Sequence, residues 1–325
     1  MRDFNLEKLD KKDKMIMNAL ENNSRASFKE IGKNVGLSGE NAEYRIERML
    51  KNGLISRMFA EPNLSKLGLK TYRIYLKIEN TTEKNEREIF DYFANHPRAR
   101  WYAEFEGEWD YTIRYALEKE AQLKEELDAL TVRFGQFIKA KDIVITSYQM
   151  YLPITYFTGG ERTLRELYMV DSLEKADPFD LKILSALCNN SRTKTVDIAK
   201  EIGISPDAVQ YRLRKLVESK VISFFTAWFD RRKFGYEYYK VLIWLQYATI
   251  RDEKKLIAYC QQHPNAVYIN RVMGNWDLEV DFDARNAVEI HEIVKSLKNR
   301  FAGIIRDHTT LTILRDGIPG QAKIL

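Results

Sequence analysis

The sequence predicts an α+β fold in which one unit, a winged helix-turn-helix followed by a ferredoxin-like βαββαβ domain, occurs twice in tandem. Three observations favour this fold. The two halves align without gaps at a constant offset of 167 residues. Each half opens with helical periodicity, capping residues and a glycine turn. Each half then changes to alternating strands and helices in the order βαββαβ.

The repeat covers nearly the whole chain. "DKMIMNALENNSR" at 13–25 aligns with "DLKILSALCNNSR" at 180–192, and "GEWD" at 107–110 aligns with "GNWD" at 274–277. A shared register of this length indicates the duplication of one unit of about 150 residues. The predicted segments are a first helix-turn-helix domain (1–62), a first ferredoxin-like oligomerisation and effector domain (68–152), a connector with a charged, helical stretch (153–177), a second helix-turn-helix domain (178–229) and a second ferredoxin-like domain (235–318).

Composition narrows the class of protein. The 325 residues are 45% apolar and 30% charged, with a net charge of +5 and a pI of about 8.9. This balance is ordinary for a globular protein and is compatible with nucleic acid. No apolar run reaches the roughly 20 residues that cross a bilayer, and no signal core is present. We therefore expect a cytoplasmic protein without a membrane partner.

Metal, cofactor and disulfide chemistry find little support in the sequence. Cys188 and Cys260 are too few for a disulfide framework, and we expect them in the core. Four histidines without a Cys/His cluster argue against a metal site. No cofactor is expected.

The first third of each half has the pattern of a helix-turn-helix. Ser27 can cap one helix, and Gly36 can end it in the left-handed conformation. Ser38, or Ser205 in the second copy, can cap the next helix, which projects from the surface. Residues 220–230 then read as the strand pair of a wing.

The second copy has the more basic projecting helix. Val209, Leu213, Leu216 and Val217 form its apolar stripe, and its predicted DNA contacts are Ser205, Gln210, Tyr211, Arg212, Arg214 and Lys215. Amide and guanidinium groups can read base edges in the major groove, and cations can hold phosphates. The alternative is a solvated helix on an ordinary three-helix bundle.

The first copy has the more acidic projecting helix. Its predicted DNA contacts are Ser38, Asn41, Tyr44, Arg45 and Arg48. Glu40, Glu43 and Glu47 on the same helix oppose contact with phosphate. The alternative is a helix that binds DNA poorly or that meets a protein.

The remaining two thirds of each half alternate strands and helices. Residues 71–78 alternate strictly and predict a half-buried strand. A helix at 86–97, two strands with a glycine turn at 100–117, a helix with Leu123, Leu127, Leu130 and Phe134 on one face, and a strand at 142–152 follow. This is the ferredoxin-like order.

The combination resembles the Lrp/AsnC family of transcriptional regulators: a helix-turn-helix, a short linker, and βαββαβ with a G-x-[aromatic]-D turn. The resemblance implies a regulator that binds double-stranded DNA, pairs through its sheets and senses an amino acid or related molecule. It places the effector site near the turns, at Gly107, Trp109, Asp110, Gly274, Trp276 and Asp277. The alternative is that these residues only shape the turns.

The duplication also predicts how the sheets pair. Exposed sheet edges favour association, and one chain here carries both sheets. We expect an intramolecular pseudo-dimer, or a homodimer through the ferredoxin-like sheets.

Two other functions are compatible with the sequence. One is a ligand-sensing or scaffold protein with vestigial DNA-binding helices. The other is an enzyme like the siroheme decarboxylases, which are similar in fold but replace the G-x-[aromatic]-D turn. Because both copies keep Gly and Asp, and because His96 and His263 precede proline at helix ends, we expect no catalytic residue and no enzyme.

Overall fold

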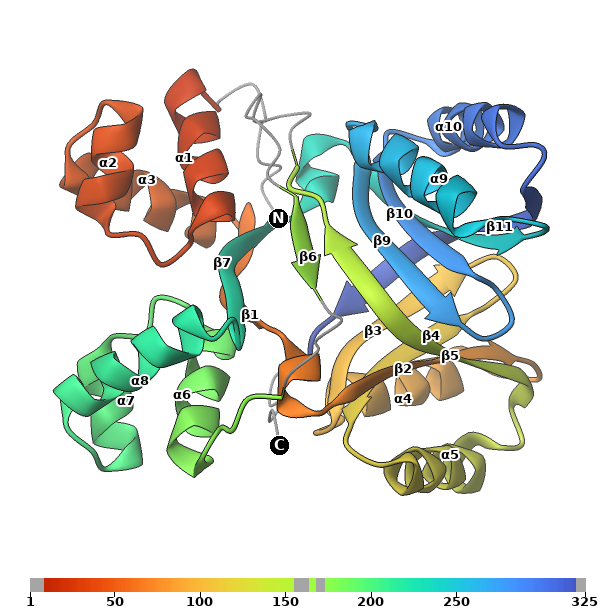
Figure 1. The fold of residues 1–325 in the computed structure, drawn as a ribbon, viewed down its shortest axis with the longest axis horizontal. Helices are drawn as coiled ribbons and strands as arrows, with labels where there is room; N and C mark the ends of the chain where they lie inside the picture. Colours follow the sequence, from red (N-terminus) through yellow and green to blue (C-terminus); the bar gives the residue numbers. More distant parts are fainter. Residues whose placement is uncertain (1–8, 155–163, 168–172, 320–325) are drawn as a thin grey trace. The chain divides into compact units, whose positions relative to one another are not determined.

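A computed structural model of the protein describes residues 9–154, 164–167 and 173–319 (Figure 1). The chain forms two compact units, each of which combines equivalent parts of both copies. The head unit comprises the described residues of Met1–Asn63, Pro153–Leu164 and Glu174–Tyr236. The sheet unit comprises those of Leu64–Leu152, Arg165–Leu173 and Glu237–Leu325. The bounds of the five predicted segments remain predictions.

The head unit contains two three-helix heads. The first consists of α1 (Lys11–Asn22), α2 (Phe28–Val35) and α3 (Gly39–Lys51), and the second of α6 (Pro178–Asn189), α7 (Thr195–Ile202) and α8 (Pro206–Glu218). Aspartates cap α1 and α6, and serines cap α3 and α8. Gly36 and Gly203 end α2 and α7 in the left-handed conformation, which glycine adopts without steric penalty.

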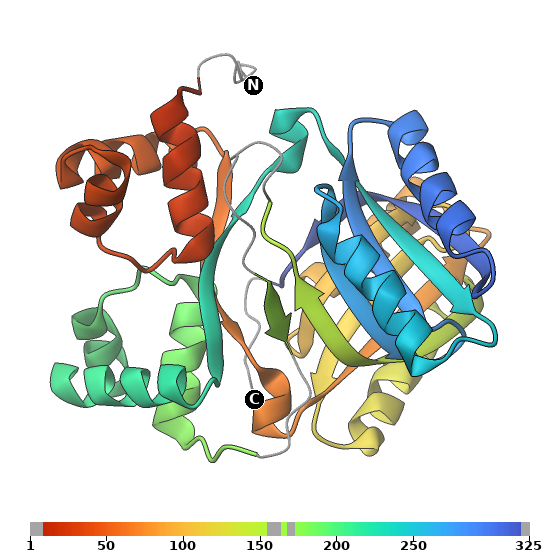
Figure 2. The same cartoon turned by 45° about the horizontal axis from the view of Figure 1, so that its top comes forward.

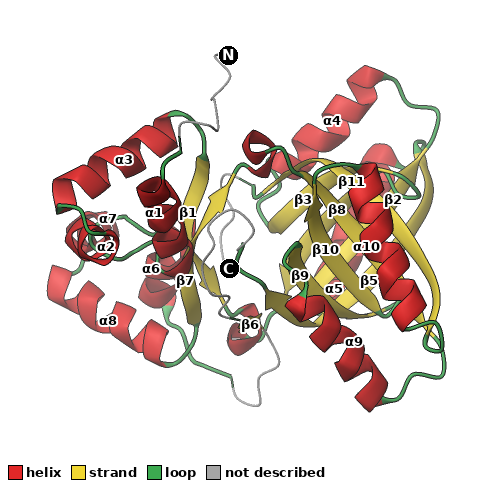
Figure 3. Cartoon of the chain, turned by 90° about the horizontal axis from the view of Figure 1, so that it is seen from above, coloured by secondary structure: helices red, strands yellow, loops and turns green. Residues whose placement is uncertain are grey.

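The predicted wing differs from the observed one. Each head contributes a single strand, β1 (Ile55–Pro62) or β7 (Ile222–Phe229), and these two strands pair antiparallel with each other. The expected strand pair within one copy is therefore replaced by a ribbon shared between copies. Helix α1 packs against β7, and α6 packs against β1, so each head rests on the strand of the other. Figure 3 shows the β1–β7 ribbon beside the helices of both heads. A short 3-10 turn at Arg231–Phe234 follows β7.

The sheet unit contains both βαββαβ motifs. After a 3-10 turn at Leu64–Leu67, the first copy forms β2 (Lys70–Ile78), α4 (Glu83–Ala94), β3 (Ala99–Glu106), β4 (Tyr111–Leu117), α5 (Glu120–Phe134) and β5 (Ile138–Tyr151). The second copy forms β8 (Glu237–Leu245), α9 (Ile250–Gln262), β9 (Ala266–Met273), β10 (Leu278–Ala284), α10 (Ala287–Arg300) and β11 (Ile305–Gly317).

The two four-stranded sheets join at both edges. The strand order is β2-β4-β3-β11-β8-β10-β9-β5-β6, and β5 also pairs with β2, which closes the sheet on itself. The long strands β5 and β11 make the joints, because each pairs with its own copy along one half and with the other copy along the rest. Helices α4 and α5 cover one outer face, and α9 and α10 cover the other (Figure 2).

Closure buries the inner faces of both sheets. The prediction of a half-buried strand at 71–78 is therefore wrong, since Arg73 and Tyr75 on its second face are 3% and 0% exposed. The sequence of one copy does not reveal the partner sheet that covers this face.

Part of the predicted connector is described. Residues 155–163 and 168–172 lie outside the described residues. The described stretch between them is not the expected helix but a short strand, β6 (Arg165–Leu167), which pairs with the end of β5. Within the described ranges, no helix is long and apolar enough to span a bilayer.

Candidate nucleic-acid interface

Helix α8 is positioned by its cap and by its apolar stripe. Ser205 accepts a hydrogen bond from the amide of Ala208, and Pro206 occupies the first turn. Val209, Leu213 and Leu216 are buried, which fixes the rotation of the helix. Val217, which the sequence placed on the same stripe, is exposed.

The opposite face of α8 is open to solvent. Gln210, Tyr211, Arg214 and Lys215 are exposed. Neither Arg214 nor Lys215 belongs to an ion pair within the described part of the chain. An amide, a phenol and two cations on one accessible helix face are the groups that contact bases and phosphates in a major groove.

Arg212 has a different environment from its neighbours. Its Nη1 lies 2.6 Å from Asp177 Oδ2 and 2.8 Å from Asp180 Oδ1. Hydrogen bonds to Asp180 and Asp177 raise the pKa of Arg212. Asp177 is also the cap of α6, so the same carboxylate starts α6 and holds α8 against it. Arg212 therefore positions the helix.

In the first head, two arginines of α3 form ion pairs of the same kind with carboxylates at the start of α1. Arg45 Nη1 lies 2.8 Å from both Asp10 Oδ2 and Asp13 Oδ1, and Arg48 Nη2 lies 2.7 Å from Asp13 Oδ2. Both arginines that the sequence predicts as DNA contacts on α3 are thus engaged with carboxylates. Ser38 accepts from the amide of Asn41 as the helix cap. Asn41 and Tyr44 are exposed.

The two heads are tied by reciprocal contacts. Ser24 Oγ lies 2.7 Å from Ser191 Oγ, its counterpart in the second copy. Arg25 donates to the carbonyl oxygens of Ser191 and Thr193. Arg192 donates in return to those of Ser24 and Ala26, at 2.8 Å and 3.0 Å. Together with the β1–β7 ribbon, these bonds hold both helix-turn-helices in one body.

The predicted effector turns have clear packing roles. Asp110 Oδ2 accepts from the amide of Ile78, and Asp277 Oδ2 from that of Leu245, each at 2.7 Å. A Cβ on Gly107 would lie 2.9 Å from the side chain of Leu311, and one on Gly274 would lie 2.6 Å from that of Val144. Each glycine thus lets a turn of one copy approach a long strand of the other.

Trp109 and Trp276 extend from these turns into the space between the sheets. They are 7% and 1% exposed, and their ring centroids are 6.4 Å apart. Trp276 Nε1 donates to Glu279 Oε1 at 3.2 Å, whereas Trp109 Nε1 is buried without a hydrogen-bond partner. The six predicted effector residues therefore fall at two turns that meet the same interior.

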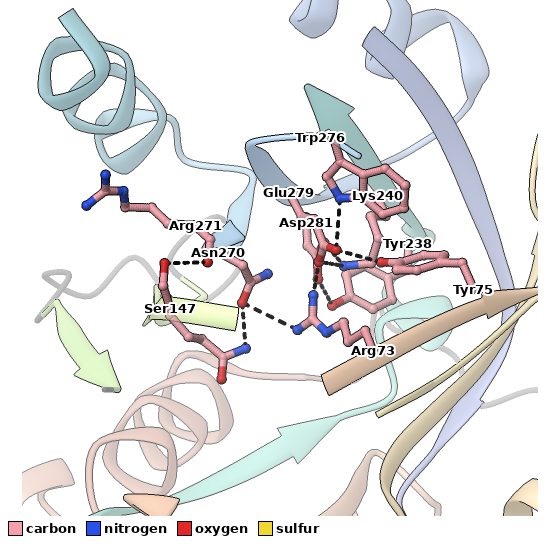
Figure 4. Close-up of polar contacts among 11 residues, drawn as sticks. Arg73, Tyr75, Ser147, Tyr238, Lys240, Asn270, Arg271, Trp276, Glu279 and Asp281 are labelled. Carbon is pink, nitrogen blue, oxygen red and sulfur yellow. Dashed lines mark hydrogen bonds and ion pairs between the residues drawn. The ribbon is translucent and has the colours of Figure 1, made fainter. Parts of the chain in front are cut away.

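The sequence did not reveal the buried charges of this interior. Arg73, Lys240, Glu279 and Asp281 are at most 3% exposed and contact one another or their neighbours (Figure 4). The signal that the sequence offered was the alternation of acidic and apolar residues in "LEVDFDA" at 278–284. This signal is ambiguous, because a solvated strand face and a charged interior face have the same pattern in one sequence.

His96 and His263 each have a partner within their own copy. His96 Nε2 lies 2.9 Å from Glu126 Oε2, and His263 Nδ1 accepts from the amide of Asn265. Cys260 is buried, as expected, while Cys188 is only half-buried. Among the described residues there is no group of three or more His, Cys, Asp or Glu side chains that could hold a metal ion.

Comparisons with known proteins bear on both heads. A family model for the AsnC-type helix-turn-helix domain matches residues 9–50, and a winged helix-turn-helix DNA-binding model matches residues 177–223. An uncharacterized HTH-type transcriptional regulator of Pyrococcus furiosus is 33% identical over 122 residues, which are 37% of this chain and 80% of the relative. The chain belongs to the Lrp/AsnC family of transcriptional regulators.

Other members and a fold relative extend this result. The regulatory protein AsnC of Haemophilus influenzae is 25% identical over 151 residues, which are 46% of this chain and 99% of AsnC. The crystal structure of the siroheme decarboxylase NirDL with an iron-uroporphyrin III analogue matches 97% of this chain and 94% of its own, with a TM-score of 0.67 and 13% identity. That likeness shows a shared fold. The family membership makes this chain a DNA-binding transcriptional regulator.

Proposed function

We propose that this Lrp/AsnC regulator binds double-stranded DNA sequence-specifically and chiefly through the second head. The observation that carries the proposal is the open face of α8, where Gln210, Tyr211, Arg214 and Lys215 stand together on a helix whose rotation is fixed. Gln210 suits an adenine edge, Arg214 suits a guanine edge, and Lys215 suits a phosphate.

The first head contributes less in this proposal. Glu43 and Glu47 occupy the positions of Gln210 and Arg214 in the repeat. Arg45 and Arg48 are held by Asp10 and Asp13, so contact with DNA would first break those ion pairs. Carboxylates repel the phosphates of DNA, and α3 therefore weakens binding instead of adding to it.

Selection of genomic fragments with the purified protein, followed by gel-shift titration, tests the proposal. We expect the double variant Arg214→Ala/Lys215→Ala to bind selected DNA about 10-fold or more weaker, because a base contact contributes about 1–3 kcal/mol. It also flattens the dependence of log affinity on log salt by about one for each phosphate contact that is lost.

The matched control is Glu47→Ala, at the position equivalent to Arg214. Its affinity should equal or exceed that of the parent. Absence of binding by the parent at low salt, where phosphate contacts are strongest, would instead support a ligand-sensing or scaffold protein with vestigial helices.

We further propose that an amino acid or a related small molecule modulates binding at the effector turns in the cytoplasm. The reciprocal contacts between heads favour a response in which the head pair acts as one body. Because Asp110 and Asp277 already bind backbone amides, these two residues are better assigned to shaping the turns. Thermal shift with a pool of amino acids tests for an effector; no shift with any of them would contradict it.

We also propose that the chain catalyses no reaction. The support is the nature of its relatives and the separate, engaged positions of His96 and His263. Incubation with siroheme, followed by absorbance in the Soret region and product analysis, tests this. A bound spectrum together with loss of carboxylate groups from siroheme would overturn it.

A further inference from the structure

The inner faces of the two sheets carry different charges at equivalent positions. On β4 of the first copy, the apolar core takes Tyr111, Ile113 and Tyr115, so alternation turns Thr112, Arg114 and Ala116 inward. The equivalent inward residues of the second copy are Glu279, Asp281 and Asp283. Arg73 and Lys240 are equivalent and both cationic. The first face is thus cationic, and the second carries an excess of carboxylates.

Direct contacts join these charges across the copies. Glu279 forms an ion pair with Arg73 and accepts a hydrogen bond from the hydroxyl of Tyr75 at 2.8 Å, and both of those residues lie on β2 of the first copy. Within its own copy, Glu279 also accepts from Trp276 at 3.2 Å and lies 3.4 Å from Lys240 Nζ. Asn270 of the second copy accepts from Gln149 of the first at 2.7 Å.

Because these charges are buried, the stability of the sheet pair depends on the balance between cations and carboxylates. Arg73, Lys240, Glu279, Asp281 and Asp283 are all at most 3% exposed. With half-buried Arg114, the inward positions of β2, β4, β8 and β10 hold three cations and three carboxylates. A buried charge without a partner is strongly destabilising. Two first-copy faces packed together would bring four cations into contact, with no inward carboxylate on β2 or β4 to pair with them. Two second-copy faces packed together would bring six carboxylates into contact with only two lysines.

We propose that the inner faces form a matched pair that cannot be exchanged for two like faces, so that a first-copy sheet pairs only with a second-copy sheet. The partner is normally in the same chain, and a second chain can enter only by reciprocal exchange of unlike sheets. Every closed sheet pair then comes with one head of each kind. This last consequence for DNA rests on the proposed function, but the pairing rule does not.

Transplanting residues between equivalent positions of the full chain tests the rule. Glu279→Thr/Asp281→Arg gives the second face the first copy's residues, and Thr112→Glu/Arg114→Asp does the reverse. Each double variant leaves the interior unbalanced, and we expect its unfolding midpoint to fall by about 10 °C or more. The quadruple variant combines both pairs, restores three cations to three carboxylates, and is expected to recover most of the lost midpoint.

Tryptophan fluorescence is the readout, since Trp101, Trp109, Trp244 and Trp276 lie in the sheet unit and only Trp228 lies in the head unit. Double variants as stable as the parent would overturn the rule. So would a quadruple variant no more stable than the doubles, because the loss would then come from local packing. Recovery in the quadruple variant with unchanged DNA binding supports the rule. If the quadruple variant recovers its stability but neither it nor the parent binds DNA, the pairing rule stands and the proposed function is rejected.

Discussion

At the scale of one residue, the arginines on the two projecting helices show that the same side chain can have different roles. Arg212, Arg45 and Arg48 have the composition of DNA contacts but are bound by carboxylates at helix starts. Those carboxylates precede them by 32 to 35 residues in the chain. Only folding brings them together, so the sequence could predict that α8 is basic but not which of its cations are available.

Arg212→Ala should therefore act mainly on stability. It leaves Asp180, whose side chain is 6% exposed, without its partner, while Arg212 itself is 27% exposed. We expect a loss of about 1–2 kcal/mol in the free energy of unfolding of the head unit. Thermal unfolding followed by circular dichroism measures this, with Arg214→Ala as the control of unchanged stability. Equal unfolding temperatures for both variants would contradict the assignment.

Lys240 gives the sheet unit a dependence on pH. Burial lowers the pKa of Lys240 to about 8, even though Asp281 favours its charged form; Arg73 and Arg114 act in the same direction as burial. Between pH 8 and the ordinary lysine pKa near 10.4, the unfolded chain binds one more proton than the folded chain, so stability rises with pH. Burial raises the pKa of Tyr75, which reverses the trend above about pH 10.

Chemical denaturation with tryptophan fluorescence at pH 7.5 and 9.5 measures this rise, which we expect to be about 1–2 kcal/mol. In Lys240→Met the rise should disappear, because no ammonium group remains at this position to lose a proton. A parent protein whose stability falls steadily over this range would contradict the expectation.

At the scale of the element, the order of helices and strands follows from the sequence, but their partners do not. The ferredoxin-like order and the helix-turn-helix were both predicted. The shared β1–β7 ribbon and the second buried face of β2 were not, because strand periodicity reports only that a face is buried and not which copy covers it.

The turn glycines allow a matched test at this scale. Gly274→Ala would place a Cβ 2.6 Å from Val144 and 2.9 Å from the carbonyl oxygen of Ile143, so we expect a loss of about 1–3 kcal/mol in unfolding free energy. Gly303→Ala meets nothing within 4 Å and should be neutral or stabilise by up to about 1 kcal/mol. Denaturant titration of both variants compares them, and similar losses would rule out the close approach as the cause.

At the scale of the whole molecule, the two copies have diverged in both units. The head unit carries one basic and one acidic projecting helix in a single body, and the sheet unit carries one cationic and one acidic inner face. Both asymmetries depend on few residues at equivalent positions. We therefore expect an operator with one strongly contacted half rather than a palindrome.

Glu43→Gln/Glu47→Arg tests this by giving α3 the residues of α8. The variant should protect a longer stretch of DNA in footprinting and should show a steeper dependence of log affinity on log salt, since one more cation faces the duplex. The parent should protect the shorter stretch. A parent footprint with two equally protected halves would contradict the unequal heads.

The sequence by itself determined the duplication, the order of the elements, the caps of the projecting helices and the family, because these depend on local propensity and on spacing along the chain. Tertiary structure alone decided which arginines are free, which strand completes each head and which charges share the interior. These outcomes depend on contacts between residues that are far apart in the chain, and burial there changes a charge from a solvated group into one that requires a partner.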